Sequence, residues 1–394
     1  MEEGSYAEGV IGVYPSVTYP SHTTIVTGRL PAEHGIYTNL SSRVAGKNPK
    51  DWFWFAKDIK TPTVWDVARE NGLTTAAVFW PATTGGRINW DIPEIWDPQK
   101  GAVGDPLYVA KFATPGILFE AALEIGLPEG HTDDDLTRTK LAAFLLKKHK
   151  PNLLLVHLTG LDGAEHRAGP RSSEAAATLE GLDTRIGELL AAVKDAGFAE
   201  ATDVFVVSDH GFLPVEREIN PNVLLVKAGL LQVDSNGLVT GGKVATVASG
   251  GSFFLYWPES RELGREVDTA LAPLRAEGVL WGVLDPAAIR ELGGDPAIRL
   301  ALEAAAGAGF DDRACGEVIR KLKGTAGTHG YLPFRSGLEA ALIAWGPRIK
   351  KGVKLGRIPM TAIGPTVLRS LGIGDSQLGA QPPLWELLNL HREK

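Results

Sequence analysis

Two short apolar runs in this chain are each followed directly by an Asp and a His, and this repeated pattern restricts the fold more than any other feature. Residues 152–158 (NLLLVHL) lead into LDGAEHRAG, and residues 203–207 (DVFVV) lead into SDHGF. A third run, residues 340–345 (AALIAW), follows shortly after THGY. Runs of Leu, Val and Ile bounded by turn residues are typical of buried strands. Because ligands gather at the carboxyl ends of strands in α/β sheets, we expect these polar groups to meet at one sheet edge.

Amphipathic segments separate the apolar runs, and this alternation predicts an α/β fold. Residues 132–150 begin with Thr132 in a capping position, carry three Asp in the first turn and have three Lys and a His near the end, an order that suits the helix dipole. Residues 173–196 and 361–371 also have helical signals. Residues from about 215 to 325 have weaker strand signals and many Gly, so we expect an inserted lobe there.

Composition excludes several classes of protein. The 394 residues have a net charge of −7, which argues against a broad nucleic-acid-binding surface. The single Cys, Cys315, excludes an internal disulfide and a multi-cysteine zinc or iron–sulfur site. No apolar run approaches the roughly 18 residues that would span a bilayer, and MEEGSYAEGV at the N-terminus does not have the pattern of a signal peptide.

The Asp and His side chains at the predicted strand ends suit a zinc site. Asp162 and His166 follow the first run, Asp209 and His210 follow the second, and His329 precedes the third. Zinc binds imidazole nitrogen and carboxylate oxygen, and catalytic zinc sites leave one position open. Two such ions about 4 Å apart stabilise the attacking and leaving oxygens of a phosphoryl transfer. Either pair alone would equally suit a turn or a cap, but together they predict a metal centre.

The other histidines of these regions are predicted to be structural or exposed. We expect His157 to be a strand residue with its hydrogen bonds satisfied inside the fold. We expect His131, His149 and His391 at the surface.

The segment near the N-terminus resembles a known family. Residues 13–28 (VYPSVTYPSHTTIVTG) would by themselves predict only a turn and the start of a helix. The longer string PSVTYPSHTTIVTGRLPAEHGIYTN is similar to the nucleophile segment of the nucleotide pyrophosphatase/phosphodiesterases, which belong to the alkaline phosphatase superfamily of binuclear zinc enzymes. The resemblance continues in TPTVWDVARENGLTTAAVFWPAT, both Asp/His segments, HGYLP, LIAWGPRIKKG and IGPTVLRSLGI. These motifs keep the family's order, with residues 84–130 and 215–323 least covered.

The resemblance implies a single alkaline-phosphatase-like catalytic domain over residues 1–394. Its fold would be a central, mostly parallel sheet flanked by helices on both faces, with a smaller inserted lobe. In the family a strand several tens of residues before the nucleophile supplies one more zinc-binding Asp, but no Asp precedes Thr18 here. We therefore expect the first strand to be missing, either because the chain is an N-terminally truncated form of a longer protein or because it starts at a mis-chosen Met.

The resemblance also implies two Zn²⁺ ions, the second of them in a site that is incomplete without the further Asp. The implied ligands are Asp162, His166 and His329 for the first ion, and Asp209, His210 and Thr18 for the second. Carboxylate and imidazole ligands would also accept manganese or iron.

Several residues of the nucleophile segment receive roles through the resemblance. Thr18 would be the nucleophile and would form a covalent phospho-threonine intermediate. Asn39 would donate its amide to a nonbridging phosphate oxygen. Tyr19 would provide a ring on which a nucleotide base stacks. His22 and His34 match family positions without a catalytic role and are predicted to be structural.

The implied activity is zinc-dependent hydrolysis of phosphodiester or pyrophosphate bonds in small nucleotide-type substrates. Asn39 and Tyr19 favour diesters, since a monoesterase usually needs further Arg or Lys contacts for the additional phosphate charge. A phosphomonoesterase or a phosphonate hydrolase stays an alternative; the second would need lysines near its substrate's carboxylate, and Lys47, Lys50 and Lys57 lie in a suitable region. A non-catalytic metal-binding relative is a further alternative because of the absent Asp.

The compartment and the oligomeric state stay open at this level. Export to the periplasm or the extracellular space is expected if a leader precedes the chain, and a cytoplasmic location otherwise.

Overall fold

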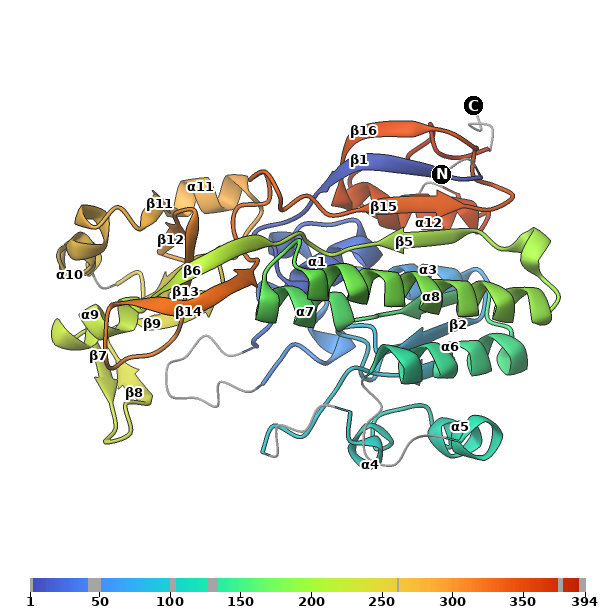
Figure 1. Ribbon diagram of the computed structural model, residues 1–394, viewed down its shortest axis with the longest axis horizontal. Helices are drawn as coiled ribbons and strands as arrows, with labels where there is room; N and C mark the ends of the chain where they lie inside the picture. Colours follow the sequence, from blue (N-terminus) through green and yellow to red (C-terminus); the bar gives the residue numbers. More distant parts are fainter. Residues whose placement is uncertain are drawn as a thin grey trace.

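A computed structural model of the chain describes residues 3–41, 51–99, 104–126, 134–260, 262–374 and 378–389. Two sheets form the half of the molecule that contains the N-terminal strand (Figure 1). The first sheet has the order β16 (Lys354–Pro359), β1 (Ser5–Ile11), β15 (Leu342–Trp345) and β5 (Val204–Val207). The second has the order β3 (Trp90–Ile92), β2 (Thr75–Val78) and β4 (Leu153–Val156). The three apolar runs of the sequence are β4, β5 and β15, so their prediction as strands is confirmed.

The strands of these sheets are mostly parallel. β16 is parallel to β1, and β3, β2 and β4 are parallel to one another. β15 runs antiparallel to both of its neighbours, β1 and β5. The seven strands form two sheets rather than one because β4 and β5 are not paired with each other.

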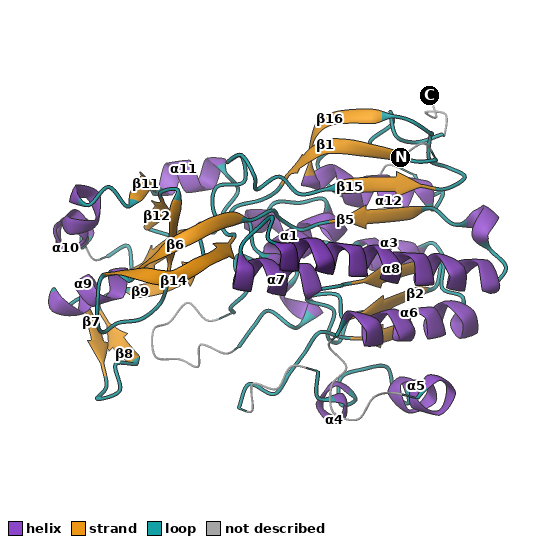
Figure 2. Cartoon of the chain, viewed as in Figure 1, coloured by secondary structure: helices purple, strands orange, loops and turns teal. Residues whose placement is uncertain are grey.

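Helices cover both faces of the sheets, as Figures 1 and 2 show. One group is α1 (Thr18–Thr27), α3 (Val64–Glu70) and α12 (Ile363–Ser370); the other is α5 (Ile117–Ile125), α6 (Asp135–His149), α7 (Gly160–Ala168) and α8 (Ser173–Asp195). The alternation of side chains along β2 shows the two faces. Ala77 packs into the core cluster that contains residues of α1, α3 and α12, whereas Ala76 and Val78 pack into the cluster that contains residues of α5 and α6. The predicted fold class is therefore confirmed.

The predicted helices form with small shifts at their ends. Thr132 lies outside the described residues, and Asp134 caps α6 by accepting a 2.9 Å hydrogen bond from the Thr137 N–H, a contact of about 1 kcal/mol in such positions. α12 begins at Ile363 rather than at residue 361 because residues 360–362 form a 3₁₀ turn. Among the described residues, none of the helices combines the length and apolar character needed to cross a bilayer.

The chain between β5 and β15 builds three further sheets on the opposite side of Figure 1. These are β11 (Leu280–Leu284), β12 (Leu300–Ala304), β10 (Ser252–Tyr256) and β9 (Ala245–Ser249); β13 (Gly307–Phe310), β6 (Leu213–Ile219) and β14 (Ile319–Thr328); and β7 (Leu231–Val233) with β8 (Val239–Gly242). The helices there are α9 (Pro221–Lys227), α10 (Gly264–Ala276) and α11 (Pro286–Glu291), and α2 (Pro31–His34) and α4 (Pro106–Val109) complete the fold. The division into one domain with a lobe at about residues 215–325 stays a prediction.

β4 and β5 are unusual because each is the edge of its sheet and is only half-buried. All four residues of β2 are buried, whereas three of four in β4 and all four in β5 are only partly buried. Directly after β4, the His157 N–H donates to the Val78 carbonyl of β2. Because successive N–H groups along a strand point to opposite sides, those of Leu154 and Val156 point away from β2. Each of these two strands therefore has one edge without a partner strand among the described residues.

The open edges predict fast hydrogen exchange at alternate amides. We expect the amides of Leu154 and Val156 to exchange at least about tenfold faster than that of Leu155, whose N–H faces β2, because exchange requires an N–H without a lasting hydrogen bond. Residue-resolved exchange by mass spectrometry measures this difference. Equally slow exchange at all three amides would show that this edge is covered in solution.

Candidate active site

Asp162, His166 and His329 present three donor atoms to one point. Asp162 and His166 lie four residues apart on α7 and therefore on one face, and His329 follows β14. His166 Nε2 is 3.5 Å and His329 Nε2 is 3.6 Å from Oδ1 of Asp162, and the two Nε2 atoms are 3.2 Å apart. Donors bound to tetrahedral zinc at about 2.0–2.1 Å are roughly 3.4 Å from each other. The separations therefore fit one zinc ion.

The backbone fixes the orientation of both imidazoles. His329 Nδ1 is 3.1 Å from the carbonyl of Ser16, and His166 Nδ1 is 3.0 Å from the carbonyl of Gly327. A carbonyl only accepts, so each Nδ1 is the protonated nitrogen and each Nε2 presents a lone pair. Two lone pairs and a carboxylate oxygen that converge in this way repel one another unless a cation lies between them, which supports a metal site.

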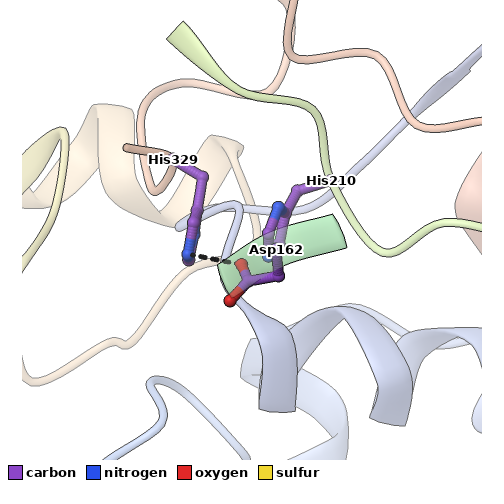
Figure 3. Close-up of side chains that lie close together, drawn as sticks. All are labelled: Asp162, His210 and His329. Atoms are coloured by element: carbon purple, nitrogen blue, oxygen red, sulfur yellow. Dashed lines mark ion pairs between the residues drawn. The ribbon is translucent and has the colours of Figure 1, made fainter. Parts of the chain in front are cut away.

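His210 adds a fourth donor residue, and the third imidazole, beside this group (Figure 3). Its side chain is 2% exposed, and neither ring nitrogen makes a hydrogen bond with a described residue, although Nε2 lies 3.2 Å from the Asp209 carboxylate. Its ring stacks on that of His329 with centroids 3.7 Å apart. One ligand atom from each of Asp162, His210 and His329 lies within 4.8 Å of the others. Buried polar atoms without partners are costly, and a metal ion would satisfy them.

Asp209 supplies the carboxylate next to His210. Its Oδ2 is 3.2 Å from His210 Nε2 and 3.5 Å from His22 Nδ1. Burial favours the neutral acid, but the surrounding imidazoles, His210 and His22 foremost, hold the pKa of Asp209 well below its usual range. Metal ligands act in their deprotonated forms, so an ionised Asp209 is suited to bind a cation.

Burial is the main cause of the pKa shifts of His329 and Asp162, two of the ligands implied for the first ion. Burial, assisted by His210 and His166, lowers the pKa of His329 well below its usual value and keeps the imidazole neutral. Burial also raises the pKa of Asp162, against the opposing effect of His166. A bound cation would favour the ionised form of Asp162.

Thr18 begins α1 and lies close to the Asp209 side of the site. Nδ1 of His22, one helical turn later, lies 2.9 Å from the Thr18 carbonyl oxygen. The same Nδ1 atom lies 3.5 Å from the Asp209 carboxylate. The start of a helix carries the positive end of the helix dipole, although in α1 the Tyr19 N–H is already bonded to Asn39 and Pro20 has no N–H. A phosphoryl group on Thr18 would therefore lie where negative charge is stabilised.

Asn39 is oriented by the residue after Thr18. The Tyr19 N–H donates a 2.9 Å hydrogen bond to Oδ1 of Asn39, so the amide NH₂ of Asn39 is directed elsewhere. Asn39 lines a cavity of about 220 Å³ beside the metal ligands. The residues around the cavity are Val17, Thr38, Asn39, Leu40, Trp52, His166, Val247, Ala248, Ser249, Gly250, Thr328 and His329. The arrangement suits donation from Asn39 to a phosphate oxygen.

Tyr19 does not have an open face for a nucleotide base in this arrangement. Its side chain is fully buried, and its hydroxyl donates a 3.0 Å hydrogen bond to Glu94. Trp52 packs edge-on against the Tyr19 ring at 5.3 Å and lines the cavity. Trp52 is thus the aromatic side chain that a ligand in the cavity would contact. The aromatic string DWFW at residues 51–54 is the sequence feature that could have indicated it.

The structure also places the remaining histidines. His22 and His34 are buried, and burial lowers the pKa of His22 to about 4 and that of His34 to about 3. His157 lies just beyond the end of β4 rather than in the strand, and its Nδ1 is 3.0 Å from Glu94, so it has the expected partner inside the fold. His149 is not a surface residue, because its ring stacks on Trp90 and its side chain is 17% exposed. His131 and His391 lie outside the described residues.

Of the three lysines of the phosphonate alternative, only Lys57 is described, and it is not among the described residues that line the cavity. The Lys57 ammonium lies 5.1 Å from the centre of the Phe55 ring. Lys47 and Lys50 lie outside the described residues. Those described residues that line the cavity include no Lys or Arg.

Comparison with known proteins extends these observations. The family model described as "Type I phosphodiesterase / nucleotide pyrophosphatase" matches residues 1–277. Human ectonucleotide pyrophosphatase/phosphodiesterase family member 1 is 26% identical over 219 residues, which are 53% of this chain and 20% of that protein. Venom phosphodiesterase 2 of Crotalus adamanteus is 27% identical over 220 residues, 53% of this chain and 23% of that protein. The match thus spans about a fifth of the length of these curated relatives.

Solved structures show a similar fold over nearly the whole chain. Human ectonucleotide pyrophosphatase/phosphodiesterase 5 aligns with a TM-score of 0.69 at 18% identity, covering 99% of this chain and 92% of that chain. The murine protein, as an inactive threonine-to-alanine variant in complex with AMP, aligns with a TM-score of 0.70 at 19% identity, covering 98% of this chain and 92% of that chain.

Proposed function

Because this chain belongs to the type I phosphodiesterase/nucleotide pyrophosphatase family, we propose that it hydrolyses phosphodiester or pyrophosphate bonds in nucleotide-type substrates. The observation that most supports this is the convergence of donors from Asp162, His166 and His329, 3.2–3.6 Å apart, beside a cavity. The donors fit zinc. Bound zinc would act as a Lewis acid that stabilises charge on the phosphoryl and alkoxide oxygens.

The reaction would proceed by two displacements at phosphorus. The Thr18 Oγ attacks and loses its proton to solvent, an Oγ–P bond forms, and the bond from phosphorus to the leaving alkoxide or phosphate breaks. Water then attacks the phospho-threonine, and the P–Oγ bond breaks to restore Thr18. During both steps the positive end of the α1 dipole and the Asn39 amide stabilise the charge on the nonbridging oxygens.

The substrate class rests on the cavity and on one relative. The murine structural neighbour contains AMP. In this chain the Trp52 ring at the cavity wall would pack against the base of a nucleotide. A diester suits the cavity better than a monoester, because the described lining residues provide no cationic side chain for a second phosphate charge.

The experiment compares three substrates on zinc-loaded protein. We expect bis(p-nitrophenyl) phosphate to be turned over with kcat/KM at least about tenfold above that of p-nitrophenyl phosphate, and no turnover of phosphonoacetate. Replacement of Asn39 by Ala should lower kcat for the diester by about 10²-fold, as the loss of one donor to a developing oxyanion does.

The other outcomes identify the alternatives. Faster turnover of the monoester, or any turnover of phosphonoacetate, would contradict the diesterase proposal. Zinc binding without turnover of any substrate would indicate a non-catalytic metal-binding protein. Asn39→Asp serves as the matched control, since it keeps the Oδ1 acceptor for Tyr19 while removing the donor, and should be as impaired as Asn39→Ala.

A further inference from the structure

The turn that bears His329 and the turn that leads to Thr18 are joined through Ser16. The Ser16 carbonyl accepts from His329 Nδ1 and, at 2.9 Å, from the Gly330 N–H. The Ser16 hydroxyl donates to the Tyr331 carbonyl at 2.9 Å. The position of the His329 imidazole therefore depends on a segment that ends two residues later at Thr18.

A buried carboxyl group from the lobe side bonds to both turns. Glu303 lies on β12 and is 0% exposed. Its Oε1 accepts from the Tyr14 hydroxyl at 2.8 Å, and its Oε2 accepts from the Leu332 N–H at 3.0 Å. Tyr14 comes four residues before Thr18, and Leu332 comes three residues after His329. Glu303 thus contacts neither the ligands nor the nucleophile directly.

The hydrogen bonds of the Ser252 hydroxyl indicate the protonation state of Glu303. Ser252 is fully buried and makes hydrogen-bond contacts with both Oε1 of Glu303 and the carbonyl of Gly330, the latter at 2.6 Å. One hydroxyl has one proton, and the Gly330 carbonyl can only accept it. Both contacts are satisfied together if the carboxyl of Glu303 is protonated and donates to Ser252.

We propose that Glu303 is a positioning residue that, as a neutral carboxylic acid, holds the His329 turn in register with the turn leading to Thr18. The inference rests on the proposed function, in which His329 is a zinc ligand and Thr18 is the nucleophile. The chain of contacts runs from Glu303 through Ser252 to Gly330, next to His329, and from Glu303 through Tyr14 toward Thr18.

The burial of Glu303 agrees with the neutral form. Burial raises the pKa of Glu303 to about 7, although hydrogen bonds from Ser252, Tyr14 and Leu332 and the charge of Arg335 oppose this effect. Because the pKa is raised in the fold, the stabilisation from this group is complete below the pKa of the unfolded chain and is lost as the pH rises to about 7. Tyr14 and Tyr331 are the other titrating groups that interact with Glu303.

The test compares Glu303→Leu with Glu303→Gln. Leu removes every hydrogen bond, whereas Gln keeps the volume, accepts from Leu332 through its oxygen and can donate through its NH₂ to the hydroxyls of Ser252 and Tyr14. We expect the Leu variant to bind zinc about tenfold more weakly, measured by competition with a chromophoric chelator at pH 6.5, and to show about tenfold lower kcat on bis(p-nitrophenyl) phosphate with an unchanged KM. Gln should restore both values, and the ratio of wild-type to Gln kcat should fall as the pH rises from 6 to 8.

Several results would overturn the proposal. One is a Glu303→Leu variant with the zinc affinity and kcat of the wild type. Another is a Glu303→Gln variant whose zinc affinity and kcat are no higher than those of Glu303→Leu. The third is a ratio of wild-type to Gln kcat that does not change with pH. Glu266→Leu, at a half-exposed carboxylate on α10, is the matched control and should change neither quantity. If Glu303→Leu does not fold, Ser252→Ala must weaken zinc binding for the proposal to stand. Zinc affinity does not require turnover, so an inactive wild-type protein would reject the proposed function without deciding this one.

Discussion

Replacement of Thr18 by Ala should abolish turnover of phosphodiesters. The variant has no oxygen that can form the covalent intermediate, and loss of a nucleophile costs at least about 10⁴-fold in kcat, or about 5 kcal/mol of transition-state stabilisation. The measurement is steady-state hydrolysis of bis(p-nitrophenyl) phosphate by zinc-loaded protein. Thr18 is the first residue of α1 and none of its side-chain atoms caps the helix, so we expect the fold to persist.

The controls separate the nucleophile from other roles of Thr18. Thr18→Ser keeps a hydroxyl and should retain a measurable fraction of the wild-type rate. Brief reaction of wild-type protein with substrate, followed by acid quench and mass spectrometry, should detect a phosphoryl group on Thr18. A Thr18→Ala variant with more than about a tenth of the wild-type rate would disprove the assignment of the nucleophile.

Replacement of His166 by Ala should remove the first metal ion. His166 supplies one of three donors, and losing a direct ligand should weaken zinc binding by more than the roughly 10²-fold that outer-shell changes cause. Its side chain is 42% exposed, so the substitution leaves little buried space behind. We expect a loss of zinc in elemental analysis of dialysed protein and a fall in diester turnover of at least about 10²-fold.

A second histidine provides the matched control for this experiment. His149 lies on α6, stacks on Trp90 and contacts none of the candidate ligands. His149→Ala should keep wild-type zinc content. Wild-type zinc content in His166→Ala would contradict the first metal site, whereas equal losses in both variants would point to general destabilisation.

The strands and the residues that follow them were predictable because both signals are local. Apolar runs of four to seven residues between turn residues identify β4, β5 and β15, and the chemistry of Asp and His identifies the candidate ligands. Their convergence followed from one general rule about strand ends in α/β folds. The helix boundaries were less exact, since Thr132 and Asp134 are both capping residue types and the structure shows Asp134 in this role.

The contacts around the site were not predictable, because they join residues far apart in the sequence. Tyr19 could have faced a ligand, but its hydroxyl bonds to Glu94, 75 residues away, and the ring is enclosed. Glu303 has no motif around it and lies in the part of the chain with the weakest sequence signals. Its role depends on Tyr14, 289 residues away, and on Leu332.

The sequence by itself determined the α/β class, the family and the identity of the Asp and His side chains, because periodicity and residue chemistry are properties of short segments. The tertiary structure decided which nitrogen of each imidazole faces the site, which aromatic ring reaches the cavity and which buried carboxyl joins the two turns. These choices depend on carbonyls, hydroxyls and burial supplied by distant segments. Hydrogen-bond direction and desolvation act over a few ångströms in space and leave no periodic signal along the chain.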